Sequence, residues 1–448
     1  MDVRIYKGAN IKIKGVADRV YANISKSSYY AVKPTDFHLL IPKMVVKVGD
    51  YVKAGEILFF DKNNDQIKFT SPVSGVVSDI VRGPKRKILK VLVKSDDEIV
   101  YKQFEKKSIT DIDRSIIVKD MLNGGLWPLI RQRPFATIAN PSDKPKSIFI
   151  SAFDSSPLAP DNDFIFHGDK ELFQMGLDIV SKLSEGTTHL NLDGNSNSAQ
   201  SFRNASGVQI NNIYGPHPSG NVGVQIHHID PINKGDIVWY LSPQDIVMIA
   251  RFFRDGKYDA SKIIALTGSK VKKPRYYRIV QGMSIKSIVD NNLYEGDKRF
   301  ISGNVLTGTK INEDGYISYY DFQITVIPEG NYSEFFGWLL PGLNKFSLSR
   351  TFFSWLSRKK EYDLDSNTHG EERAYVVTGQ YESYFPIDVF PVQLVKAVLI
   401  EDIELMEKLG IYEVDTEDFA LCEYSCTSKV PVQSIIRKGL DLIKKECS

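Results

Sequence analysis

Two of the three cysteines lie four residues apart in the stretch ALCEYSC, near the end of the chain. If Asp415 or Thr416 caps a helix there, Cys422 and Cys426 share one face of that helix. Two thiolates at this spacing can bind a metal, but a tetrahedral site or an iron–sulfur cluster needs about four ligands. Only Cys447 could add a thiolate, and C-x-x-C pairs are absent. We therefore expect Cys422 and Cys426 to be buried structural residues, insufficient for a cluster, with no metal bound.

A second stretch, NGGLWPLIRQRPF (123–135), combines a pair of glycines with aromatic and cationic side chains. A glycine-rich turn before a helix can cradle phosphate, and arginines beside aromatic rings can hold a planar ring system by stacking. The side chains that could do so are Trp127, Arg131, Arg133 and Phe135. Because no G-x-G-x-x-G accompanies them, the competing interpretation is a helix start with a buried tryptophan.

Three of the seven histidines, His217, His227 and His228, occur in GPHPSGNVGVQIHHIDP. We expect the adjacent pair on a strand, where neighbouring side chains point to opposite faces and rarely bind one metal. The glycines and prolines indicate a loop at a sheet edge that could lie over a pocket. His217 could then donate a hydrogen bond to a ligand.

Positive charge gathers in VRGPKRKILK (81–90). Such a stretch is usually a solvated hairpin, and the alternative is a docking edge for an acidic partner or for lipid headgroups. No segment pairs a nucleophile with a base, or one catalytic carboxylate with another. The chain alone therefore does not resemble a hydrolase or a transferase.

The composition is that of an ordinary globular protein, with 448 residues, 42% of them hydrophobic and 25% charged. The length indicates roughly two to four domains. A net charge of +2 predicts neither nucleic-acid binding nor a strongly basic membrane patch. The few cysteines favour a reducing compartment. The N-terminus lacks the apolar core of a secretion signal, and no stretch approaches the roughly 20 apolar residues of a membrane helix. We expect a cytoplasmic chain without a transmembrane helix.

Residues 1–100 have short apolar runs separated by glycine turns, a pattern typical of a compact β barrel or sandwich. The part VKVGDYVKAGEILFFDKNNDQIKFTSPVSGVV resembles the hammerhead of biotinyl and lipoyl carrier domains. In those carriers a lysine at a hairpin tip bears the cofactor. We expect the tip near Asn63 and Asn64, with Lys62 outside it, so a borrowed scaffold is favoured over a working carrier arm.

Residues 101–256 alternate strands and helices, which predicts an α/β sheet. KSIFISAF, THLNL and DIVWYL are the expected strands. The stretch KELFQMGLDIVSKLSEG has a helical apolar face and ends at Gly186. In SPQDIVMIARFFRDG, Ser242 is the expected N-cap and Gly256 the expected end of a helix.

Residues 257–335 predict a small α+β unit of the β-grasp kind. The last region, 336–448, begins with a loop-rich polar segment and continues as a helical domain. Within it, the apolar face of residues 391–410 predicts one helix that ends at Gly410, and VPVQSIIRKGLDLIKKE predicts another.

Several of these stretches together resemble one protein family. They are GLWPLIRQRPF, IFISAFDSSPLAPD, YGPHPSGNVGVQIHHIDP, PIDVFPVQLVKAVLIEDIELMEKLG and EDFALCEYSC, in this order. The family is the A subunit of the bacterial Na+-translocating NADH:quinone reductase, and the resemblance runs almost from end to end. It implies a multi-domain α/β and α+β chain. The implied domains are an N-terminal biotinyl/lipoyl-like β domain, a Rossmann-like α/β domain similar to the flavin subunit of complex I, a β-grasp (soluble-ligand-binding-like) domain and a C-terminal helical domain.

The resemblance also implies a setting for the chain. It would be a peripheral protein on the cytoplasmic face of the bacterial inner membrane, within a six-subunit complex, docked chiefly on the membrane-embedded B subunit. That complex passes electrons from NADH through flavins and iron centres to ubiquinone and exports Na+, and the redox cofactors would sit in partner subunits. NGGLWP stands where relatives carry a fuller glycine loop, and LCEYSC where they carry a four-cysteine cluster. The resemblance therefore implies a retained scaffold without cofactors.

Quinone is the one ligand that the resemblance leaves for this chain. A quinone site needs an apolar slot with one or two donors. The candidate residues are Trp127, Arg131, Arg133, Phe135 and His217. Two other functions stay open: an autonomous NADH/flavin dehydrogenase subunit, against which the missing glycines and cysteines argue, and a carrier or ligand-binding module.

Overall fold

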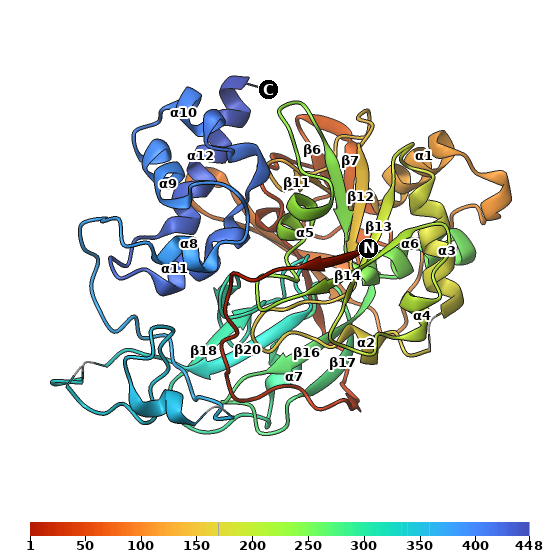
Figure 1. Cartoon of the computed structure of the whole chain (residues 1–448). Coiled ribbons are helices and arrows are strands. Elements are labelled where there is room, and N and C mark those ends of the chain that lie inside the picture. The colour runs from red at the N-terminus through yellow and green to blue at the C-terminus, as the bar shows by residue number, and fades with distance from the viewer. Residues whose placement is uncertain (169, 333, 338, 358, 448) are drawn as a thin grey trace.

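The computed structural model describes residues 1–448 with the exception of 169, 333, 338, 358 and 448 (Figure 1). In this described part, the strands form a seven-stranded, a six-stranded, a four-stranded and a three-stranded sheet. One continuous core runs through all four sheets, and a second core lies among the C-terminal helices. The coarse expectation of several α/β and α+β units therefore agrees with the structure.

The two smaller sheets form the N-terminal β unit. Their strands are β3 (Tyr29–Val32), β4 (Pro42–Met44), β5 (Tyr51–Val52), β6 (Ile57–Asp61), β7 (Asn64–Thr70), β8 (Gly75–Arg82) and β9 (Ile88–Ser95). Apolar side chains such as Phe59, Phe69 and Val91 alternate inward and are buried, as expected for half-buried strands. Asp61 pairs with Asn64, so Lys62 and Asn63 form the exposed hairpin tip. The expectation that Lys62 lies outside the tip is wrong.

The seven-stranded sheet has the order β1-β14-β13-β12-β15-β10-β11. Its strands are β1 (Asp2–Arg4), β10 (Arg131–Arg133), β11 (Thr137–Ile138), β12 (Ser147–Ser151), β13 (Thr188–Asp193), β14 (Gln209–Tyr214) and β15 (Val238–Leu241). All neighbouring strands are parallel except for β10, which is antiparallel to both β15 and β11. Since β1 pairs with β14, the first residues of the chain extend this sheet rather than the N-terminal β unit.

Helices cover both faces of this sheet (Figure 1). They are α1 (Arg114–Gly124), α2 (Asn162–Ile165), α3 (Lys170–Ser181), α4 (Gln200–Arg203), α5 (Val222–Ile229) and α6 (Pro243–Asp255). Alternate side chains of β12 explain the two layers, because Ile148 and Ile150 join the core of α3 and α6 while Phe149 packs with α5. Ser242 caps α6, and Gly256 ends it with a φ of 65°, as the sequence predicts.

The six-stranded sheet has the order β19-β18-β20-β16-β17-β2. Its strands are β2 (Tyr21–Ala22), β16 (Ser261–Thr267), β17 (Arg275–Val280), β18 (Lys298–Ser302), β19 (Thr309–Ile311) and β20 (Gln323–Pro328), and the short helix α7 (Lys286–Val289) follows β17. The strands and the helix expected after residue 257 are therefore present. The boundaries 1–100, 101–256, 257–335 and 336–448 stay a prediction.

The C-terminal helices are α8 (Gln380–Tyr384), α9 (Pro391–Leu399), α10 (Ile403–Lys408), α11 (Ala420–Ser425) and α12 (Val432–Cys447). The single helix expected over 391–410 is wrong. Glu401 has a φ of 57°, and the Asp402 side chain accepts a hydrogen bond from the Leu405 amide, so a new helix begins at this cap. None of the described helices has both the length and the apolar character that crossing a membrane requires.

Candidate functional site

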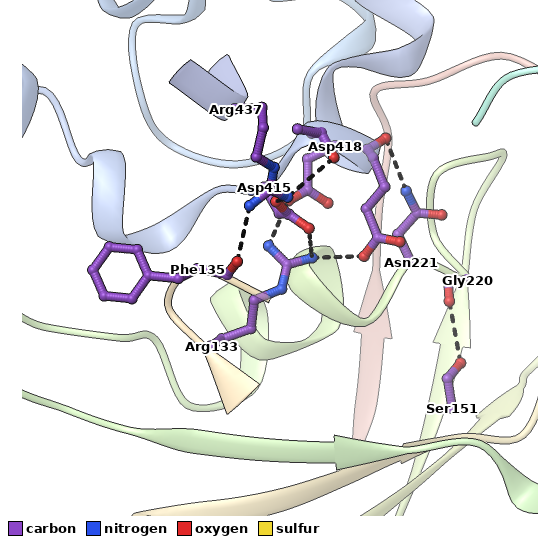
Figure 2. Close-up of polar contacts among 10 residues, drawn as sticks. Arg133, Phe135, Ser151, Gly220, Asn221, Asp415, Asp418 and Arg437 are labelled. Carbon is purple, nitrogen blue, oxygen red and sulfur yellow. Dashed lines mark hydrogen bonds and ion pairs between the residues drawn. The ribbon is translucent and has the colours of Figure 1, made fainter. Parts of the chain in front are cut away.

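Arg133 lies at the centre of a buried ionic cluster between the α/β sheet and the C-terminal helices (Figure 2). It ends strand β10, which lies between β15 and the edge strand β11, and its side chain is only 1% exposed. Nη1 lies 3.2 Å from Asp418 Oδ2, and Nη2 lies 2.6 Å from Glu417 Oε1. Asp415 is within 3.9 Å. We call Arg133, Asp415, Glu417, Asp418 and Arg437 the Arg133 cluster.

A helix start presents the three carboxylates of the cluster. Asp415 caps the short 3-10 helix η7 (Thr416–Phe419), and the Asp415 and Asp418 side chains accept each other's backbone N–H, a reciprocal capping pattern. Arg437 reaches over from α12, pairs with Asp415 and donates to the Phe135 carbonyl at 2.9 Å. Of the two caps that the sequence allows, Asp415 and Thr416, the structure uses Asp415. The cluster connects β10, η7 and α12.

Glycine at position 223 lets α5 approach the cluster. A Cβ there would lie 2.7 Å from Asp418 Oδ2 and 3.0 Å from Arg133 Nη2. In addition, the Asn221 side chain donates to the Glu417 carbonyl. Helix α5 thus forms one wall of the cluster, and no side chain separates it from the ions.

Burial and charge shift the pKa values of the cluster in different directions. Burial raises the pKa of Asp418 to about 7, although Arg133 acts against this. For Asp415, burial raises the pKa, but Arg133 and Arg437 outweigh it and the net shift is downward. The pKa of Arg133 rises, because Asp418, Asp415 and Glu417 outweigh the effect of burial. Arg133 is therefore a permanently charged structural link between two parts of the chain.

Arg131, two residues earlier, is placed differently. Its guanidinium carbon lies 4.5 Å from the centre of the Tyr240 ring and 4.4 Å from that of Tyr320, which are stacking distances for a cation on aromatic rings. The side chain is half-buried, and its guanidinium makes no hydrogen bond or ion pair among the described contacts. Arg133 Nε is also without a hydrogen-bond partner, but it is buried, so Arg131 is the candidate in this stretch whose guanidinium is partly exposed and not paired with a carboxylate in the described contacts.

Trp127 and Phe135 belong to the hydrophobic cores. The Trp127 side chain is fully buried, packs edge-on against Trp239 and donates from Nε1 to the Ala139 carbonyl at 2.7 Å. Phe135 joins the core of the C-terminal helices. Both side chains therefore pack in the cores that flank β10 and are not available to a ligand.

The glycine pair closes a helix rather than opening one. Gly124 is the last residue of α1, and Gly125 caps it with a φ of 72°, as left-handed caps commonly do. A Cβ on Gly125 would lie 2.4 Å from Thr70, so the glycine also permits close packing on the N-terminal β unit. The glycines follow α1 and open no α-helix, so the phosphate cradle is wrong. The short 3-10 helix η4 (Trp127–Leu129) begins after them and its Trp127 is buried, which agrees with the competing interpretation.

A small cavity lies next to Gly125. Its volume is about 20 Å³, which is room for a single water rather than for a quinone ring. Its lining includes Phe69, Thr70, Gln281 and Tyr319, and Gln281 Oε1 is buried without a hydrogen-bond partner. Tyr319 packs against Tyr320, so the cavity adjoins the ring stack of Arg131. These lining residues carry no motif that the sequence analysis could have recognised.

The histidines lie on a loop and a helix. His227 and His228 belong to α5, so their expected strand is wrong. His227 contacts Glu413 at 2.7 Å, and His228 contacts the Val224 carbonyl. His217 lies in the preceding loop, with Nδ1 3.0 Å from Ser155 Oγ and Nε2 buried without a partner. Burial lowers the pKa of His217 to about 4, so its ring is neutral at pH 7.

Cys422 lies in α11, whereas Cys426 follows the last residue of that helix in an extended conformation. The expectation that one helix face carries both cysteines is therefore wrong, because the helix ends at Ser425. Cys422 and Cys426 are buried, and Cys447 is exposed. Cys426 Sγ accepts a hydrogen bond from the Tyr381 hydroxyl at 3.0 Å, and burial raises the pKa of Cys422 well above its usual value. Within the described residues, His, Cys, Asp and Glu side chains form no group of three that could hold a metal ion.

Comparisons with known proteins match the chain over nearly its whole length. Three family models match it: the NqrA N-terminal barrel-sandwich hybrid domain over residues 3–96, the NqrA second alpha/beta domain over 112–258 and the NQRA C-terminal domain over 263–313.

Individual relatives match the chain from end to end. The A subunit of the Na(+)-translocating NADH-quinone reductase of Marinomonas sp. is 35% identical over 99% of both chains. The corresponding proteins of Pasteurella multocida and Vibrio anguillarum are 34% and 35% identical over 99% of this chain and all of theirs. Identity at this level over whole chains shows that the chain belongs to the NqrA family, the A subunits of Na(+)-translocating NADH-quinone reductases.

Proposed function

We propose that this chain works as a peripheral component of a Na+-translocating NADH:quinone reductase, on the cytoplasmic face of the membrane, and that it supports assembly on the membrane-embedded B subunit. The observation that carries the proposal is the match over 99% of this chain and 99 to 100% of relatives with that name. The activity, Na+-transporting reduction of ubiquinone by NADH, belongs to the whole complex. Flavins and iron centres reside in the partner subunits.

The absence of a redox centre in this chain is part of the proposal. Two local arrangements support it. Gly125 is packed against Thr70 where a fuller glycine loop would bind a flavin, and Cys422 and Cys426 are packed with Tyr381. The α/β unit keeps parallel strands with helices on both faces, which fits a Rossmann-like scaffold retained without its nucleotide.

Deleting this one chain tests the proposed function. In the parent membranes we expect Na+-stimulated quinone reduction by NADH to be lost, while NADH oxidation by artificial acceptors persists because the flavins lie elsewhere. Loss of both activities would still support a role in assembly. Unchanged quinone reduction would refute the proposal, and the intact mass of the chain would then show whether Lys62, at the exposed hairpin tip, carries biotin or lipoate.

We also propose Arg131 as the quinone contact. A quinone is a flat ring with two carbonyl acceptors, and a guanidinium supplies several N–H donors in one plane. Arg131 stands between two tyrosine rings and makes no described hydrogen bond or ion pair, whereas Arg133 is bound to carboxylates and Trp127 to Ala139. Arg131 is thus the candidate best placed to meet a planar acceptor.

Replacing Arg131 by Gln should raise the KM for quinone about tenfold, the value of one hydrogen bond from a charged donor. NADH oxidation by artificial acceptors should not change. Arg203→Gln is the matched control, because Arg203 is exposed at the end of α4. A quinone KM equal to that of the control in an assembled complex would remove Arg131 from the site.

A further inference from the structure

One segment, residues 335–360, has a composition unlike the rest of the chain. It contains seven aromatic residues, five leucines and five basic residues, and no acidic residue. The whole chain, by contrast, has a net charge of only +2. Aromatic, aliphatic and cationic residues together are typical of segments that rest in the interface of a membrane.

Most of the apolar side chains that the structure describes in this segment are exposed. Phe335 is 90% exposed, Leu356 is 66% exposed and Leu339 is 62% exposed. Further exposed members are Phe336, Leu340, Leu343, Phe353 and Trp355. In Figure 1 the described residues of the segment lie in the light-blue loops at the lower left, beside β18. Soluble proteins rarely expose so many neighbouring large apolar side chains.

The inner side of the segment is fixed to the body of the protein. Phe346 packs with a small core that includes Ile11 and Ile13. Just beyond the segment, the Tyr362 amide donates to the Lys12 carbonyl at 2.9 Å and the Lys14 amide donates to the Tyr362 carbonyl at 3.0 Å. Since the base of the segment is held by the core and by backbone hydrogen bonds, its outward face has a defined position on the protein.

The basic side chains of the segment fall into two groups, those that are hydrogen-bonded within the protein and those that are exposed. Lys345 pairs with Glu334, which precedes the segment, and donates to the Gly337 carbonyl, while Lys360 donates to the Leu343 carbonyl. Arg350 and Lys359 are exposed beside the apolar side chains. The surface is therefore apolar with cations at its rim, which is complementary to acyl chains below anionic headgroups.

We propose that the outward face of residues 335–360 rests in the interface of a bilayer that contains anionic lipids. Lipid is the occupant that we propose, because residues 335–360 contain no acidic residue and the exposed cations Arg350 and Lys359 lie beside exposed apolar side chains. The described helices cannot span a membrane, so this contact lies on the bilayer surface. It is a separate attachment from the docking on a membrane protein proposed above.

Sedimentation of the full-length chain with vesicles tests this contact without any partner protein. We expect binding to vesicles of phosphatidylcholine and phosphatidylglycerol, weaker binding to phosphatidylcholine alone, and release as ionic strength rises. The double variant Phe335→Ser, Leu340→Ser should bind at least about tenfold more weakly, since two apolar side chains are withdrawn from lipid. Charge reversal in Arg350→Glu, Lys359→Glu should weaken binding about fivefold or more per residue.

A matched control is Ile400→Ser. Ile400 is 69% exposed on another part of the surface, so this variant should bind vesicles as the unmodified chain does. Trp355 supplies a second readout, because brominated acyl chains should quench its fluorescence, whereas Trp127 and Trp239 are fully buried. The Trp355→Phe variant should lose part of that quenching.

Two results would overturn the proposal. One is the absence of vesicle binding at low ionic strength. The other is vesicle binding that the Phe335→Ser, Leu340→Ser variant retains while it fails to co-purify with the membrane subunits, which would assign the face to a protein partner. Neither result bears on the deletion experiment, because deletion removes the whole chain, whereas these variants alter one face of it.

Discussion

Replacing Arg133 by Met should lower the free energy of unfolding by about 3 to 5 kcal/mol, the usual cost of removing one partner of a buried ion pair. The guanidinium is almost fully buried and contacts Glu417 and Asp418 directly. Without it, Asp418 and Asp415 would stay buried with Arg437 as the remaining cation of the Arg133 cluster. Urea unfolding gives the free energy, and hydrogen exchange of α12 amides should show that the C-terminal helices open first.

Two further variants sharpen this measurement. Arg203→Met changes an exposed arginine and should alter stability by no more than about 0.5 kcal/mol. Arg133→Lys keeps the charge but loses the planar fork that contacts two carboxylates at once, so we expect it to be destabilised as well, though less than Arg133→Met. If Arg133→Met were as stable as Arg203→Met, the cluster would not hold the two parts of the chain together.

Local signals explain what the sequence could predict. Helix α6 begins where Ser242 precedes Pro243 and ends at Gly256, because caps are set by residues within one turn of the helix end. The buried strands β12, β13 and β15 follow from short apolar runs. The cap near Asp415 was predictable to one of two residues for the same reason.

Long-range contacts explain what the sequence could not predict. Arg133 meets Asp418 across 285 residues of chain, and nothing in RQRPF indicates that its partners are carboxylates rather than a ligand. The glycine pair is equally ambiguous, since glycine can precede a helix or end one, and only the packing of Gly125 on Thr70 decides. Similarly, HHIDP gave no local reason to prefer the helix α5 over a strand.

The exposed face of residues 335–360 shows another limit. The expectation of a polar segment at the start of 336–448 is wrong for its first part, because residues 335–360 hold seven aromatic residues and five leucines. Loop-rich apolar stretches of this kind can be buried or exposed. The structure decides this by packing Phe346 inward and leaving Phe335 and Leu356 outward. Side-chain direction, rather than composition, turns the stretch into a surface.

Replacing Asp418 by Asn should remove a pH dependence of stability between about pH 4 and pH 7. Burial raises the pKa of Asp418 to about 7, so the folded protein holds a proton there that the unfolded chain releases near pH 4. The contribution of this proton is complete below the unfolded pKa and is lost as the pH rises through the folded one. Between pH 5 and pH 8, the unfolding free energy of the unmodified chain should therefore fall by about 3 kcal/mol relative to Asp418→Asn.

Urea unfolding of both proteins at pH 5 and pH 8 measures this difference, and Glu329→Gln is the control. Arg299, Lys310 and Ser366 lower the pKa of Glu329 to about 2, so that carboxylate is charged in both states above pH 5 and its contribution should stay constant. A constant difference for Asp418→Asn as well would mean that all three carboxylates of the Arg133 cluster remain ionised. Arg133 and Arg437 would then stabilise one more negative charge than they carry themselves, and the burial of Asp418 would cost less than its surroundings indicate.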